Sequence, residues 1–178
     1  MNKALNTKFM VATTGLVYFI GSSLAIAGCQ PQASAQECQA KAYVIDQDPQ
    51  GLNVRQQPNS QSQILGTLPL YTEVDVFDHQ DNWLLVSPID PELQDVEFKS
   101  EGWVYGSLLG LNTRGYGQDT VPLYSEPDKS DQPIAEIAAS SSVTMVGCSG
   151  EWVLIKQKNI QGWLEPDEQC AAALTSCS

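Results

Sequence analysis

Basic residues are scarce in this chain of 178 residues. Nine Lys and Arg stand against 21 Asp and Glu, which gives a formal net charge of −12 at pH 7. Nucleic-acid binding draws on clustered Lys and Arg to neutralise phosphates, and attachment to anionic lipid draws on a basic patch. The charge balance therefore argues against a nucleic-acid partner, and any membrane contact would have to come through a covalent lipid.

Residues that carry hydrolytic or metal chemistry are also few. The chain has one His, His79, and no CxxC pair for a zinc site. A Cys-His hydrolase needs a free thiolate beside an imidazole, whereas His79 falls in a predicted polar hairpin turn over residues 78–82. The acidic stretch 46–51 faintly resembles a calcium-binding loop, but Pro49 interrupts the pattern of ligand residues that such a loop needs. We predict no catalytic residue, no metal site and no cofactor.

Long apolar runs are confined to the N-terminus. Lys3 and Lys8 precede an apolar stretch over residues 9–26, which ends at Ala-Gly-Cys. This order is typical of an export signal, and we expect residues 1–28 to be that signal. A permanent membrane span is the alternative, although the run is near the lower length limit for one.

The sequence Ile-Ala-Gly-Cys at 26–29 resembles the bacterial lipobox, in which the Cys29 thiol receives diacylglycerol and the chain is cut before it. The competing interpretation is cleavage after Ala35, where small residues suit the ordinary signal peptidase. We favour lipidation at Cys29. Both routes take the protein out of the cytosol, to be lipid-anchored in the cell envelope, periplasmic or secreted. Loss of Lys3 and Lys8 leaves 7 basic against 21 acidic residues, a net charge of −14.

Residues 29–42 are rich in Gln, Ala and Ser, and we predict a flexible spacer there. Four cysteines besides Cys29 remain, an even number that suits two disulfides in an oxidising compartment. Three pairings are possible, and the sequence does not select one. Our working expectation joins Cys148 to Cys170 and Cys38 to Cys177.

The stretch 51–58 has the period of a short strand with one buried face, since Leu52 and Val54 alternate with Asn53 and Arg55. Its pattern returns, without a gap, when the chain is shifted against itself by 69 residues, which predicts a tandem repeat. The coinciding positions are Leu52, Val54, Pro58, Leu65, Leu68, Val74, Val76, Phe77, Trp83, Leu85 and Val86 on Val121, Leu123, Pro127, Ile134, Ile137, Val143, Met145, Val146, Trp152, Leu154 and Ile155.

Short strands at this spacing predict an all-β fold, with one small barrel over residues 43–112 and a divergent second one over 113–178. The closing tryptophans, Trp103 and Trp163, are only 60 residues apart, so the second copy lacks nine residues of the loop before Trp103. Loops tolerate such a deletion and cores do not. The tail at 170–174 is expected to form at most one helical turn.

The first copy resembles the bacterial SH3-type domain (SH3b), an exported small β-barrel. The resemblance rests on Gly-Leu-Asn-Val-Arg at 51–55, Leu-Gly-Thr-Leu at 65–68, Trp-Leu-Leu-Val at 83–86 and Gly-Trp-Val at 102–104. It covers residues 43 to about 112. It implies SH3-like barrels that bind or position ligands in the cell envelope, in several relatives peptidoglycan or its peptide stems, and it does not imply catalysis.

Aromatic side chains are the candidate ligand contacts. Tryptophans that repeat in position suit a core or rim role in each barrel. The functional interpretation is an aromatic groove that grips sugar or extended peptide, with an arginine placed to meet a carboxylate. The candidate residues are Arg55, Tyr71, Trp83, Trp103 and Tyr105.

Together these observations predict a non-enzymatic module of the cell envelope that binds peptidoglycan or a wall-associated ligand. The alternative is a periplasmic adaptor or inhibitor that contacts an envelope protein through its acidic face. A hydrolase is the third class, and it would have to depend on His79. We expect membrane contact only through a lipid at Cys29.

Overall fold

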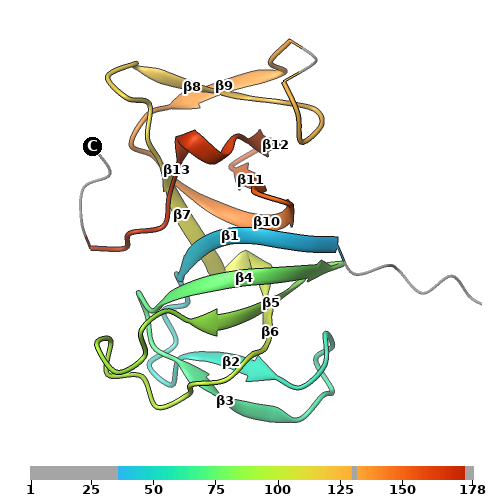
Figure 1. Cartoon of the computed structure of the whole chain (residues 1–178), viewed down its shortest axis with the longest axis vertical. Coiled ribbons are helices and arrows are strands. Elements are labelled where there is room, and N and C mark those ends of the chain that lie inside the picture. The colour runs from blue at the N-terminus through green and yellow to red at the C-terminus, as the bar shows by residue number, and fades with distance from the viewer. Residues whose placement is uncertain (1–35, 130–131, 175–178) are drawn as a thin grey trace, which may run out of the picture. The chain divides into compact units, whose positions relative to one another are not determined.

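The computed structural model describes residues 36–129 and 132–174. Over these residues the chain forms thirteen β-strands and two short 3-10 turns, with no α-helix (Figure 1). The all-β prediction is confirmed. None of the helical turns in the described residues is long and apolar enough to cross a membrane. The predicted export signal, the lipobox with Cys29, and Ala35 lie outside the described residues.

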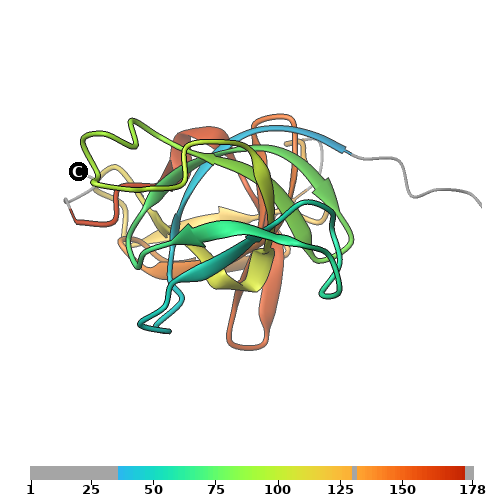
Figure 2. The same ribbon diagram turned by 90° about the horizontal axis from the view of Figure 1, so that it is seen from below.

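The first half of the molecule is built from antiparallel pairs in the order β1-β4-β5-β6-β2-β3. Val74 and Val76 on β4 point inward and are at most 1% exposed, as their alternation predicts. Seen from below, these strands curve around a common centre (Figure 2). The elements are β1 (Gln36–Val44), β2 (Leu52–Arg55), β3 (Ile64–Leu68), β4 (Glu73–Gln80), β5 (Trp83–Pro88), β6 (Gly102–Tyr105) and the 3-10 turn η1 (Gly106–Leu108).

The second half pairs its strands in the order β7-β10-β11-β12, while β8 and β9 form a separate two-stranded sheet. An isolated antiparallel bridge between Tyr124 and Trp163 brings the end of β8 against β12. The elements are β7 (Leu109–Thr113), β8 (Thr120–Leu123), β9 (Ala135–Ala138), β10 (Ser142–Ser149), β11 (Trp152–Gln157), β12 (Ile160–Leu164), the 3-10 turn η2 (Pro166–Glu168) and β13 (Gln169–Cys170).

Strand β7 belongs to both halves. It pairs with β1, where Tyr43 stands opposite Gly110, and with β10, where Val143 stands opposite Leu111. The expected boundary between residues 112 and 113 therefore falls inside a strand rather than in a linker. Buried residues of both halves form one continuous hydrophobic cluster, so the halves share a core.

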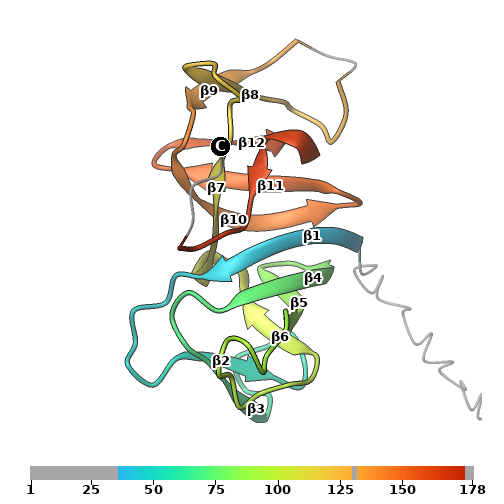
Figure 3. The same cartoon turned by 60° about the vertical axis from the view of Figure 1, so that its left-hand side comes forward.

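The predicted spacer over residues 29–42 is wrong from residue 36 onward, because this stretch is most of β1. Figures 1 and 3 place β1 between β4 and β10. Cys38, Ala40 and Ala42 point inward and are 0–6% exposed, while the residues between them are exposed. Small inward side chains suit a strand packed closely between two others, and the lack of large apolar residues concealed the alternation.

Cys38 is joined to Cys148, with their Cα atoms 5.5 Å apart. Both expected pairs, Cys148 with Cys170 and Cys38 with Cys177, are therefore wrong. Cys170 is itself disulfide-bonded, and Cys177 lies outside the described residues. The pairing follows from β1, which carries Cys38 alongside β10. Two backbone hydrogen bonds between residue Gly150 and β1 fix the same approach, at 2.7 and 3.0 Å.

His79 lies in β4 rather than in a turn, since the hairpin between β4 and β5 consists of Asp81 and Asn82 alone. Its ring packs against Gly147 of β10, where an added Cβ would lie 3.0 Å from the imidazole Cε1 atom. The imidazole therefore helps to join the two halves. The tail at 170–174, for which at most one helical turn is expected, contains none, because Cys170 ends β13 and no helix follows it within the described residues.

Candidate functional site

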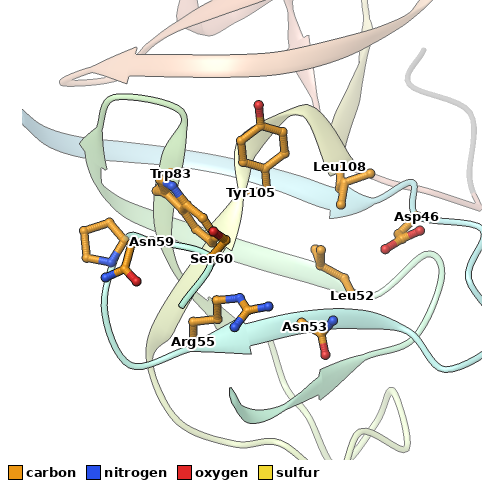
Figure 4. A pocket seen from close by; sticks show the side chains of 10 residues that line it. Asp46, Leu52, Asn53, Arg55, Asn59, Ser60, Trp83, Tyr105 and Leu108 are labelled. Carbon is orange, nitrogen blue, oxygen red and sulfur yellow. The ribbon is translucent and has the colours of Figure 1, made fainter. Parts of the chain in front are cut away.

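A groove of about 480 Å³ opens on the first half of the molecule (Figure 4). Its floor comes from β2, and its walls come from the turn after β1, from the loop after β2, from the start of β5, and from β6 with the turn that follows it. We call it the aromatic groove. It is lined by Asp46, Leu52, Asn53, Arg55, Pro58, Asn59, Ser60, Trp83, Tyr105 and Leu108.

Strand β2 forms the floor of the groove. Leu52 and Val54 are at most 2% exposed and point into the core, so Asn53 and Arg55 point outward. The Arg55 Nη1 donates a hydrogen bond to the backbone carbonyl of Ser62 at 2.7 Å. This bond uses one of the five N–H donors of the guanidinium. It fixes the side chain against the loop while further donors face the groove.

Trp83 and Tyr105 form the aromatic wall. They stand opposite each other in the β5–β6 ladder, and their rings meet edge to face with centroids 5.6 Å apart and planes at 71°. Such a geometry is favourable for aromatic pairs and holds both rings in place. Tyr105 remains 41% exposed, so the wall presents both an apolar face and a phenol hydroxyl to a ligand.

The structure brings three of the five predicted ligand residues, Arg55, Trp83 and Tyr105, into the aromatic groove. Tyr71 lies elsewhere, in the turn between β3 and β4, with φ at 68° and 47% of its surface exposed. Trp103 is half-buried opposite Arg55 in the β2–β6 ladder and does not line the groove.

Sequence reasoning missed the polar rim of the groove. Asn59 and Ser60 come from the loop after β2, and Asp46 comes from the turn after β1. The Pro-Asn-Ser run at 58–60 predicts a turn but does not show which way the turn folds. Among the lining residues Arg55 is the cation and Asp46 the anion, so an otherwise acidic protein presents one fixed guanidinium beside two aromatic rings.

The chain matches the family model of the bacterial SH3 domain over residues 50–110. This interval contains β2 to β6 and all of the groove lining except Asp46. The predicted resemblance to bacterial SH3 domains is confirmed over this interval. A search of curated proteins finds no match.

Among solved structures, NlpC2 from Trichomonas vaginalis is 14% identical with a TM-score of 0.31, over 74% of this chain and 47% of that one. NlpC1 from the same organism is 15% identical with a TM-score of 0.32, over 78% and 48%. An NlpC/P60 family protein from Bacillus cereus is 16% identical with a TM-score of 0.28, over 72% and 55%. The chain thus spans about half the length of these proteins.

Proposed function

From the bacterial SH3 domain at residues 50–110, we propose that this protein is a non-enzymatic binding module of the cell envelope, whose aromatic groove holds peptidoglycan or a wall-associated peptide. One observation carries the proposal: the groove combines an aromatic wall with a guanidinium fixed on its floor. Hydrolysis is assigned to no residue of the chain.

The chemistry of the groove suits a ligand that is flat or extended and ends in a carboxylate. Aromatic faces such as those of Trp83 and Tyr105 pack against sugar rings and peptide backbones. A guanidinium binds a carboxylate through two parallel hydrogen bonds, and Arg55 keeps donors for this purpose beyond its bond to Ser62. A stem peptide of the cell wall has both features.

The proposal also covers the location and origin of the module. Export by the signal at 1–28, with lipidation at Cys29, would hold the groove at the membrane surface facing the wall. The second half is proposed to be a divergent tandem copy. Support for this comes from the gapless offset of 69 residues in the sequence and from strand pairs that recur in the same order in both halves.

A periplasmic adaptor or inhibitor remains the second candidate, and one observation favours it. Strand β3 ends the main sheet, and its Ile64 and Leu65 are 48% and 43% exposed. A hollow of about 680 Å³ lies there, lined also by Phe98 and Lys99 of the loop before β6. An exposed edge strand with apolar side chains can accept an added strand from a partner protein.

Sedimentation with purified peptidoglycan sacculi tests the leading proposal. The wild-type protein is expected to sediment with the sacculi over a range of salt concentrations. Arg55→Gln should bind about ten- to a hundredfold more weakly, because a hydrogen bond to a charged group contributes about 1.5–3 kcal/mol. Lys41→Gln, which changes the charge equally on the exposed side of β1, should bind like the wild type.

Two exposed tyrosines provide a second matched pair. Tyr105→Ala removes half of the aromatic wall and should reduce sedimentation, whereas Tyr71→Ala, at a similarly exposed position outside the groove, should not. No retention of the wild-type protein at any salt concentration would reject the wall ligand. If Tyr71→Ala lost sedimentation and Tyr105→Ala did not, the binding site would lie outside the groove.

A further inference from the structure

The second half carries a different set of side chains at the positions that form the aromatic groove in the first half. In the β11–β12 ladder Val153 stands opposite Leu164. Continuing this register by one residue puts Trp152 beside Glu165. The equivalent neighbours in the first half are a tryptophan and an exposed tyrosine, so a carboxylate here replaces a phenol.

A tyrosine takes the position of the arginine. Tyr124 forms a bridge with Trp163, as Arg55 stands opposite Trp103 in the first half. The Tyr124 ring meets the Trp152 ring edge to face, with centroids 5.7 Å apart and planes at 87°. The second half thus has an aromatic pair and an anion where the first half has an aromatic pair and a cation.

The anion is nearly buried. Glu165 is only 8% exposed, and a carboxylate removed from water needs a cation or several hydrogen bonds. Lys129 supplies the cation by an ion pair, and 59% of its side chain is exposed. The hydrogen bond to Glu165 is the main cause that raises the pKa of Lys129, with smaller contributions from Tyr124 and Asp167.

The two partners of this ion pair differ in how firmly they are held. Glu165 is fixed by its burial and by the end of β12, and its need for a cation does not depend on which cation arrives. Lys129 extends from a surface loop and keeps most of its side chain in water. An exposed lysine gains little from such a pair, because solvent screens it and ordering its long side chain costs entropy. Another ammonium can therefore replace it at small cost.

We propose that Tyr124, Trp152 and Glu165 form a second binding site, which takes a primary alkylammonium group and which Lys129 occupies in the free protein. The buried carboxylate would bind the ammonium, and the half-exposed Trp152 ring, which the edge-to-face contact with the buried Tyr124 ring holds in place, would pack against its alkyl chain and its charge. We call this group of three residues the carboxylate site. It is separate from the aromatic groove and does not rest on the function proposed for that groove.

The test is a titration followed by the indole N–H resonance of Trp152 in proton–nitrogen correlation spectra at pH 7, assigned with Trp152→Phe. The probes are n-pentylammonium, a lysine blocked at both backbone ends, and n-pentanol as the neutral control. Both amines are expected to shift the resonance saturably and n-pentanol is not. Binding of only one amine would still support the site and would tell whether it takes a free amine or a polypeptide side chain.

Two substitutions separate the proposal from a merely structural ion pair. Lys129→Met should lower the dissociation constant of the amines about two- to fivefold, because the competing side chain is gone. Lys99→Met is the matched control, since Lys99 is paired with Glu92 at an exposed position far from the site in sequence, and it should leave the constant unchanged. Glu165→Gln, which keeps the side-chain shape, should abolish the shift.

The proposal fails if Lys129→Met leaves the affinity as it is, if Glu165→Gln binds amines like the wild type, or if n-pentanol shifts the resonance as n-pentylammonium does. The dispersion of the remaining resonances reports whether each variant is folded. Lys129 is exposed, so its variant gives a valid test even if Glu165→Gln does not fold.

Discussion

Removal of the Cys38–Cys148 disulfide should strongly destabilise the protein. The bond joins β1 to β10 and closes a loop with a sequence separation of 110 residues. Both cysteine residues are buried, with Cys38 at 4% and Cys148 at 0% exposure. The proposed variant is the double substitution Cys38→Ala and Cys148→Ala, which leaves the bond at Cys170 untouched.

The expected magnitude follows from chain entropy. Closing a loop of this length lowers the entropy of the unfolded chain by about 16 cal/mol/K, or about 5 kcal/mol at 25 °C. Measured effects are often smaller, so we expect a loss of about 2–5 kcal/mol in the free energy of unfolding. The hydrogen bonds between β1 and Gly150 persist without the sulfurs. The variant should therefore stay folded, with both halves still joined.

Urea unfolding measured by tryptophan fluorescence provides the assay. The midpoint should fall, and the slope m should rise because the unfolded chain without the cross-link exposes more surface. The single variants Cys38→Ala and Cys148→Ala should each lose about as much as the double variant, since either one breaks the bond. An unchanged midpoint and slope in the double variant would refute the reasoning. Non-reducing peptide mapping checks the pairing directly.

Two further predictions concern buried polar contacts. Thr113 is fully buried, and its hydroxyl donates to one backbone carbonyl and accepts from one backbone N–H, each at 3.0 Å. Thr113→Val should therefore cost about 1–3 kcal/mol in urea unfolding, whereas Thr120→Val, at an exposed hydrogen bond, should change stability by less than about 0.5 kcal/mol. The second prediction concerns the Lys129–Glu165 ion pair, in which Glu165 raises the pKa of Lys129 above 10.5. The stabilisation by this ion pair is therefore present below pH 10.5, and it is lost as the pH rises through the higher pKa of the folded state. The difference in unfolding free energy between wild type and Lys129→Met should be at most about 1 kcal/mol, because solvent screens the exposed lysine end of the pair. This difference should shrink above pH 10.5, and a constant difference up to pH 12 would contradict the assignment.

Local pattern was enough to predict strands β2 to β6, apart from the end of β4, and the outward face of β2. Alternation of Leu52 and Val54 with Arg55 sets which side of a strand is buried, because side chains alternate along it whatever the strand pairs with. The resemblance to bacterial SH3 domains likewise rested on residues close together in sequence. Arg55 could be chosen as a candidate ligand residue for that reason, since its exposure follows from its neighbours.

Pairing between distant segments could not be predicted in the same way. Residues 36–42 look like a spacer because their buried side chains are small, and only the contact with β4 and β10 makes them a strand. The same contact decides that Cys38 meets Cys148. Nothing local marks such a pair, since 110 residues separate the two sulfurs in the chain.

For the candidate sites too, local sequence pattern and tertiary structure determined different features. The sequence by itself determined that aromatic residues and one arginine lie on exposed faces of a β domain. Only the tertiary structure decided that Tyr105 shares a groove with Arg55 and Tyr71 does not, because the turn before β4 carries Tyr71 away. It also decided that Glu165 is buried beside an aromatic pair, since burial depends on the side chains that the fold brings from elsewhere in the chain.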